Sequence, residues 1–287
     1  MGSFAMTFRD LLLPALTYPD TTPDRALRSG VALARRLGGN LTLAPIQVDL
    51  PELRNPVANA LIDLDRKARM EEARSAAAAQ LEGVCGRIAA EEASVPITVA
   101  PVTAKLYEEV DEIARMSRTR DVCLVPVGPS APESRGVAEA VLFGSGRPVA
   151  LYPDDLEISP ADGFGAVAVA WDGSPRAARA VADALPLLRR AKDVRILVAV
   201  GEKPTAVTGI AQELLRHLSA HEIAARVDEV PVGARPIGRL LADYVAAERI
   251  DLLVMGAFGH ARMREFVLGG ATQAMLDSPP CAVLMSH

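Results

Sequence analysis

Short apolar runs alternate with longer amphipathic stretches along the whole chain. In the second half, runs such as VRILVAV (194–200) and DLLVMG (251–256) have the length and composition of buried strands. The stretch IGRLLADYVAAERI (237–250) places apolar residues at positions i, i+3 and i+4, as one face of a helix does. The order of the second half is then βαβαβαβαβ, which predicts a parallel sheet with helices on both faces.

The first half repeats this order. Its predicted strands are RDLLLPAL (9–16), NLTLAPIQV (40–48), PITVAPV (96–102), DVCLVPV (121–127) and RPVALYP (147–153), and the longest predicted helix covers about 57–93. A polar stretch with two prolines, PDDLEISPADG (153–163), separates the halves. The sequence therefore predicts an α/β, Rossmann-like chain of two tandem domains, 1–155 and 160–287, each with an open parallel five-stranded sheet.

The ends of particular strands are where a ligand site is expected. In open parallel sheets, ligands bind beyond the carboxyl ends of the strands, at the place where the strand order reverses. The residues that directly follow the first and fourth strands of each half are therefore the candidates. In the second half these are Asp172 and the glycine-rich stretch GAFGHARMREFVLGGAT (256–272).

Composition narrows the class of protein. Half of the 287 residues are hydrophobic but only 4% are aromatic, so the cores must be built from Ala, Val, Leu and Ile. A net charge of −5 without basic runs argues against a nucleic-acid-binding or membrane-surface protein. The three cysteines lie far apart without a C-x-x-C pair, which argues against a disulfide framework and a zinc site. With no membrane-length apolar run and no signal-peptide pattern, we expect a cytoplasmic protein.

The motifs of the second half resemble the universal stress protein family. The resemblance rests on three features: Asp172 at the end of the first strand, the opening WDGSPRAARA (171–180), and Gly256-x-x-Gly259 followed by nine residues and Gly269. The resemblance covers the second half and, more weakly, the first. It implies a tandem universal stress protein with strand order 3-2-1-4-5 in each half. It also implies that the halves pack as an internal pseudo-dimer, often along their fifth strands, with a further homodimer as an additional assembly.

One position departs from the family pattern. Members that bind ATP carry Ser or Thr directly after the third motif glycine, whereas this chain has Gly270 there and Thr272 two positions later. A hydroxyl that would contact a phosphate is therefore displaced or missing.

The glycine-rich stretch has the features that phosphate binding requires. Gly269, Gly270 and Ala271 open a predicted helix, so their N–H groups are unpaired first-turn donors that small side chains leave accessible. Asp172 would accept hydrogen bonds from an adenine or ribose, and His260 with Arg262 and Arg264 would shield phosphate charge. The full predicted site comprises Trp171, Asp172, Gly173, Val200, Gly256, Gly259, His260, Gly269, Gly270, Ala271 and Thr272. Its ligand would be ATP or another adenine nucleotide, with Mg²⁺ present only through the nucleotide.

Simpler interpretations of the same residues stay open. The glycine pair would only make a turn, Asp172 would only cap the turn into Ser174, and Trp171 would only pack. In the first half, Thr17 stands in the place of Asp172, and Pro126 and Pro129 occupy the G-x-x-G positions, where proline has no N–H to donate. We expect no nucleotide site there.

The sequence contains no catalytic constellation: no nucleophile with a base, no metal cluster and no P-loop lysine. The preferred hypothesis is a non-enzymatic stress-response protein that binds one adenine nucleotide in its second domain, with weak ATPase activity left open. A first alternative is a nucleotide-free scaffold of the same fold that acts through protein–protein contacts. A second is an ATP-dependent adenylating enzyme, although the exit of the first strand, WDGSP (171–175), lacks the pyrophosphate-binding signature of such enzymes.

Overall fold

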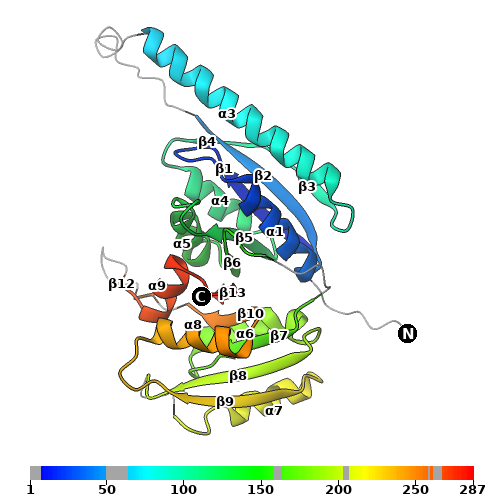
Figure 1. Ribbon diagram of the computed structural model, residues 1–287, viewed down its shortest axis with the longest axis vertical. Coiled ribbons are helices and arrows are strands. Elements are labelled where there is room, and N and C mark those ends of the chain that lie inside the picture. Colours follow the sequence, from blue (N-terminus) through cyan, green and yellow to red (C-terminus); the bar gives the residue numbers. More distant parts are fainter. Residues whose placement is uncertain (1–7, 50–63, 158–162, 203–206, 258, 261–266) are drawn as a thin grey trace.

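The computed structural model describes residues 8–49, 64–157, 163–202, 207–257, 259–260 and 267–287 (Figure 1). The first half contains β1 (Asp10–Leu16), α1 (Asp24–Leu37), β2 (Asn40–Asp49), α3 (Leu64–Glu91), β3 (Ile97–Val99), β4 (Val102–Lys105), α4 (Glu109–Ser117), β5 (Val122–Val127), α5 (Ser134–Gly144) and β6 (Val149–Pro153). The second half contains β7 (Ala166–Ala170), α6 (Pro175–Leu188), β8 (Asp193–Val200), α7 (Gln212–Ala220), β9 (Ala225–Pro231), α8 (Ile237–Glu248), β10 (Leu252–Gly256), β11 (Gly259–His260), β12 (Val267–Leu268), α9 (Gly270–Asp277) and β13 (Ala282–Ser286).

The main sheet has eleven strands in the order β3-β2-β1-β5-β6-β13-β10-β7-β8-β9, with β4 also paired to β2. Each half therefore has the predicted order 3-2-1-4-5, and the predicted parallel α/β fold is confirmed. The third strand of the first half is divided, because Pro101 interrupts it and has no N–H to donate. Both pieces keep one register on β2, with Val99 opposite Leu43 and Val102 opposite Ile46.

The two halves are joined by their fifth strands into one continuous sheet. β6 and β13 pair antiparallel, with Leu151 opposite Val283 and Val149 opposite Met285. The sequence predicts a five-stranded sheet in each half, and the structure joins the two sheets through this ladder. An antiparallel pair has a local two-fold axis, so equivalent edges of the two halves meet each other.

Two hydrophobic cores cover the two faces of this sheet, and each extends through both halves. Leu13 and Leu284 belong to one core, and Leu12 and Leu253 belong to the other, because successive residues of a strand point to opposite faces. All four side chains are 0% exposed. As composition predicts, Leu, Val, Ile and Ala make up most of both clusters.

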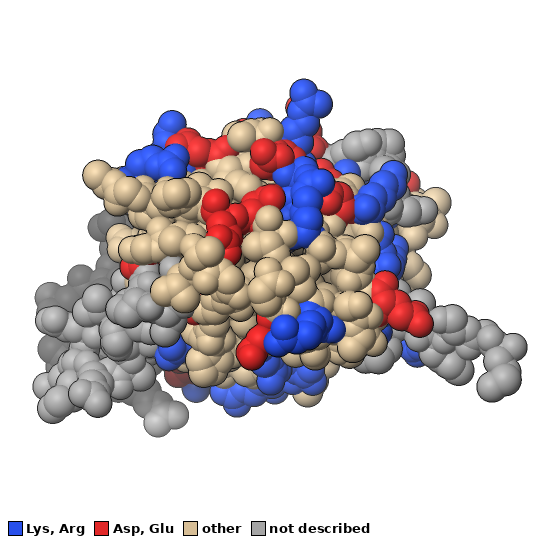
Figure 2. Space-filling model, turned by 90° about the horizontal axis from the view of Figure 1, so that it is seen from below, with Lys and Arg blue, Asp and Glu red and all other residues tan. Residues whose placement is uncertain are grey.

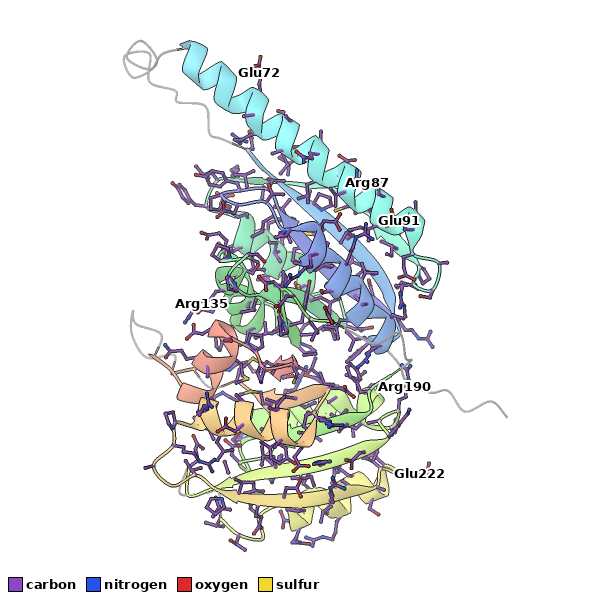
Figure 3. The ribbon with its side chains drawn as sticks, in the orientation of Figure 1. Glu72, Arg87, Glu91, Arg135, Arg190 and Glu222 are labelled. Atoms are coloured by element: carbon purple, nitrogen blue, oxygen red, sulfur yellow. The ribbon has the colours of Figure 1, made fainter. Side chains whose placement is uncertain are left out.

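Arginines add polar contacts where the halves meet. Arg190 on the α6 side donates to the carbonyl oxygen of Leu37 at 3.3 Å, at the carboxyl end of α1. Arg135 of α5 pairs with Asp277 of α9 across the same junction (Figure 3). Both arginines carry part-exposed side chains, so the buried ladder of β6 and β13 contributes more to the junction than these pairs do.

Helix α3 is the longest element and covers one edge of the first half. Leu81, Cys85 and Ile88 are buried at helical spacing and pack with the sheet. Its amino-terminal part extends past the sheet (Figure 1). Residues 57–63 of the predicted helix lie outside the described residues.

Charged side chains of both signs share one face of the molecule (Figure 2). On the face shown in Figure 2, the described Lys and Arg side chains are intermixed with Asp and Glu. Among the described helices, none is both long and apolar enough to cross a membrane. Within the described ranges, no group of three or more His, Cys, Asp or Glu side chains is placed to hold a metal ion.

All three cysteines are free and buried. Burial raises the pKa of Cys85 to about 11, and it raises the pKa values of Cys123 and Cys281 to about 12. A buried, protonated thiol is a poor nucleophile. These cysteines are therefore packing residues.

We expect thiol reagents to modify none of these cysteines in the native protein at neutral pH, and all of them in denaturant. Because native thiols stay protonated while unfolded ones ionise, the free energy of unfolding should fall as pH rises from 9 towards 11 and 12. Thiol titration and denaturant unfolding across this pH range measure both effects. Rapid modification of one thiol in the native state would contradict the assignment.

Candidate functional site

A pocket lies at the carboxyl edge of the second half, where the strand order reverses between β7 and β10. Its lining consists of Ala170, Trp171, Asp172, Leu197, Ala199, Glu202, Ile237, Leu241, Met255, Gly256, Gly269, Gly270, Ala271 and Thr272. Counted with its open mouth, the pocket contains about 620 Å³ of space that no protein atom occupies. The switch point of the sheet is therefore hollow, as expected for a ligand site.

Trp171 continues the line of β7 and forms one wall. Its N–H donates to the carbonyl oxygen of Leu197 at 2.9 Å, which keeps it in register with β8. Its indole Nε1 donates to the carbonyl oxygen of Ile210 at 3.4 Å. The ring is half-buried and packs against the core, so it is held in place beside the pocket.

Asp172 forms the turn into α6. Its Oδ1 accepts from the N–H of Ser174 at 2.9 Å, and the Ser174 hydroxyl accepts from the N–H of Ala177 at 3.2 Å, which caps the helix. Gly173 between them has a φ of +71°, a conformation that favours glycine. The turn-capping interpretation of Asp172 is thus correct, and the same carboxylate also lines the pocket.

The amino terminus of α9 opens into the pocket. Its N-cap, Gly269, has no side chain to cap the helix. Helix geometry leaves the first-turn N–H groups without carbonyl partners inside the helix, and the helix dipole makes this end partly positive. Gly269, Gly270 and Ala271 all line the pocket, so this end of the helix is suited to an anion. Thr272 also lines it, but its side chain is only 1% exposed.

Gly256 ends β10 at a very close backbone approach. A Cβ atom at this position would lie 2.5 Å from the backbone nitrogen of Ala177 and 2.5 Å from the carbonyl carbon of Arg176. Glycine is therefore needed here so that β10 can pack against the beginning of α6.

Residues 163–287 match the sequence profile of the universal stress protein family. The second half is a universal stress protein domain. The whole chain is similar in fold to a universal stress protein from Archaeoglobus fulgidus, with a TM-score of 0.68 at 18% identity over 98% of this chain and 97% of that one. A functionally unknown protein from Pseudomonas aeruginosa PAO1 has a TM-score of 0.53 at 14% identity, over 99% of this chain and 94% of that one. No curated protein sequence matches the chain.

The resemblance predicted for the second half is therefore confirmed, and the structural likeness extends the fold to the first half. The profile begins at residue 163, close to the predicted domain start at 160. Identities of 18% and 14% establish a common fold, and they do not assign the ligand.

The universal stress protein domain brings most of the predicted site together. Seven predicted residues line the pocket: Trp171, Asp172, Gly256, Gly269, Gly270, Ala271 and Thr272. Val200 lies outside the lining. It packs with the core on one face of β8, whereas its neighbour Ala199 faces the other way and lines the pocket.

The remaining predicted residues have other places. Gly173 serves the turn into α6 and lies outside the lining. Gly259 and His260 form β11, which pairs antiparallel with Leu268 and Val267 of β12. Arg262 and Arg264 lie outside the described residues.

Seven lining residues were not predicted: Ala170, Leu197, Ala199, Glu202, Ile237, Leu241 and Met255. Leu197 and Ala199 lie on one face of β8 at a spacing of two, and Ile237 and Leu241 are one turn apart on α8. Periodicity could have identified these faces. It could not show which face meets the end of β7, because this depends on the packing of α8.

The strand register corrects one equivalence between the halves. Asp121 Oδ2 accepts from the N–H groups of residues 9 and 10, and Asp251 Oδ2 accepts from those of residues 165 and 166. Residue 10 is therefore equivalent to residue 166, and counting along the strands makes Leu16 the counterpart of Asp172. The predicted counterpart, Thr17, corresponds to Gly173. In either alignment the first half lacks the carboxylate.

The equivalent place in the first half is nearly filled. The segment after β1 folds back, with the Leu16 N–H donating to the Thr22 hydroxyl at 2.8 Å and the Thr22 N–H donating to the Leu16 carbonyl at 3.0 Å. Asp154 packs against Gly128 and accepts from the N–H of Ser130 at 2.8 Å. About 190 Å³ of space is left, against about 620 Å³ in the second half.

Proposed function

We propose that the universal stress protein domain binds one adenine nucleotide and thereby acts as a non-enzymatic regulatory module in the cytoplasm. Membership of the family supports the stress-response role. The observation that carries nucleotide binding is the uncapped amino terminus of α9, which opens into the same pocket as Trp171 and Asp172. The first half would be a degenerate second domain that serves as a structural partner.

In this proposal each wall of the pocket holds a different part of the nucleotide. The phosphates would bind at the first-turn N–H groups of α9, because small residues there leave the backbone accessible. The base would lie against the apolar wall formed by residues such as Leu197, Ile237 and Leu241, beside the Trp171 ring. Mg²⁺ would enter only with the phosphates.

A nucleotide-free scaffold is the second candidate, and Gly270 favours it because a family hydroxyl is replaced there. An adenylating enzyme has less support, since the exit of β7 is a capped turn at Asp172 and Ser174. The pocket lining contains no nucleophile placed beside a histidine base.

Trp171 is the chain's single tryptophan, so its fluorescence reports on the pocket directly. We expect Mg-ATP to change this fluorescence in a saturable manner. It should also raise the free energy of unfolding by about 2.7 kcal/mol at 100 times the dissociation constant. ADP and AMP test how many phosphates are required. Unchanged fluorescence and unchanged thermal unfolding with all three nucleotides, with none released on denaturation, would favour the scaffold.

Gly270→Ser should strengthen ATP binding about tenfold, because a hydrogen bond to a charged group contributes about 1.5 kcal/mol. The position has room, since the atom nearest to an added Cβ is Ile237 Cγ2 at 3.5 Å. Gly270→Ala is the matched control, which adds the same carbon without the hydroxyl. Equal dissociation constants for the Ser and Ala variants would show that no phosphate lies at this position.

A further inference from the structure

We infer that Glu202 accepts hydrogen bonds from the ribose hydroxyls of the bound nucleotide, and that the pocket therefore takes ribonucleotides in preference to deoxyribonucleotides. This inference rests on the proposed function. It adds a specificity-determining residue that neither the motif nor the family pattern assigns.

The backbone after β8 directs Glu202 to the pocket. Gly201 has a φ of +85°, and the N–H of Glu202 donates to the carbonyl oxygen of Ala199 at 3.2 Å. The chain thus turns back as soon as the strand ends. Glu202 lines the pocket together with Ala199 and is only partly exposed.

The position of Glu202 across the sheet fits the sugar of a nucleotide. β8 and β10 flank β7, so their ends lie two strand spacings apart, about 10 Å. Glu202 follows β8, whereas the phosphate-binding end of α9 lies on the β10 side. The ribose hydroxyls are only a few bonds from the first phosphorus of a nucleotide, a shorter span than this separation, and the long side chain of Glu202 bridges the difference.

The chemistry of a carboxylate agrees with this placement. An ionised carboxylate only accepts hydrogen bonds, and its two oxygens can take both hydroxyls of a vicinal diol. It would repel a phosphate group, so a Glu in a nucleotide pocket is best placed at the sugar end. In other open parallel sheets, an acidic residue after the second strand of a nucleotide-binding unit takes this role, and β8 is the second strand of its half.

The other carboxylate of the pocket has a different task. Asp172 Oδ1 is bound to the N–H of Ser174, which fixes it at the end of β7 between the two outer strands. This places it between Glu202 and the amino terminus of α9. The two carboxylates therefore make separable contributions, and Glu202 can be changed without altering the turn into α6.

The test is a titration of Trp171 fluorescence with ATP and with 2′-deoxy-ATP. It compares the wild type, Glu202→Gln and the control Glu213→Gln, which removes the same charge from an α7 side chain that is 89% exposed. We expect the wild type to bind ATP about tenfold more tightly than 2′-deoxy-ATP, the difference of one hydrogen bond to a charged acceptor. Glu202→Gln should lose this preference because it binds ATP more weakly than the wild type does. Glu213→Gln should keep the preference.

The outcomes separate this inference from the proposed function. If the wild type binds neither nucleotide, the proposed function fails. If the wild type binds both equally, or if Glu202→Gln binds ATP as tightly as the wild type or more tightly, the inference fails and nucleotide binding stands. Tighter binding by the variant would show that Glu202 repels phosphate. Thermal unfolding of the ligand-free variant verifies that it is folded.

Discussion

Gly256→Ala is expected to lower the free energy of unfolding by about 3 kcal/mol, the upper end of the usual cost of overpacking. The added Cβ would meet two backbone atoms of α6 at 2.5 Å, and backbone cannot rotate away as a flexible side chain can. Relief requires that β10 and the start of α6 separate. Since Asp172 and Ser174 form the turn into that helix, the variant should also bind nucleotide more weakly.

Gly270→Ala is the control, because it changes a glycine of the same motif at which an added Cβ would make only an ordinary contact, with Ile237 Cγ2 at 3.5 Å. Alanine in a helix is more favourable than glycine, so this variant should be as stable as the wild type or more stable by up to about 1 kcal/mol. Denaturant unfolding followed by Trp171 fluorescence measures both variants. A Gly256→Ala protein with wild-type stability would show that the close approach of β10 to α6 is easily relaxed.

Leu284→Ala should lower the free energy of unfolding by about 2–5 kcal/mol, the usual range for truncation of a buried leucine. Leu284 lies in β13 opposite Ala150 of β6 and is 0% exposed. The hydrophobic core that contains Leu284 extends through both halves, so the substitution should destabilise both of them. We therefore expect the whole chain to unfold in one transition at a lower denaturant concentration.

Each half carries its own probe for this variant. Trp171 fluorescence follows the second half, and modification of Cys85 and Cys123 follows the first. The unfolding transitions reported by the two probes should shift by the same amount, as for a single cooperative unit. Leu215→Ala on α7 is the control, because its side chain is only partly buried and lies away from the joint, so its cost should be smaller. A shift of the Trp171 transition alone would mean that the halves unfold independently.

The elements could be predicted because buried strands and amphipathic helices impose their periods on the sequence. VRILVAV and IGRLLADYVAAERI appear in the structure as β8 and α8, close to their predicted bounds. Part of the pocket could also be predicted from the sequence. Asp172 and Gly269 to Thr272 follow strand ends at the switch point, where a ligand site is expected.

The other pocket residues and the exact equivalence between the halves could not be predicted, because they depend on strand register and packing. Val200 and Ala199 differ only in which face of β8 they occupy, and the apolar pattern of that strand has no polar face to fix the phase. Thr17 was assigned one position away from its true equivalence, because the turn after a strand has no period to align. Glu202 was missed because a single acidic residue after a strand is by itself indistinguishable from a solvated turn.

The ladder between β6 and β13 also fixes the direction in which each half presents its ligand edge. Strands are parallel within a half, but the joint is antiparallel, so the carboxyl ends of the two halves face opposite sides of the molecule. The open pocket and its filled counterpart therefore lie at opposite ends of the strands of the shared sheet. A nucleotide in the second half cannot be clasped between the halves. Whatever the first half senses of it would pass through the shared strands and through contacts such as those of α5 with α9 and of Arg190 with α1.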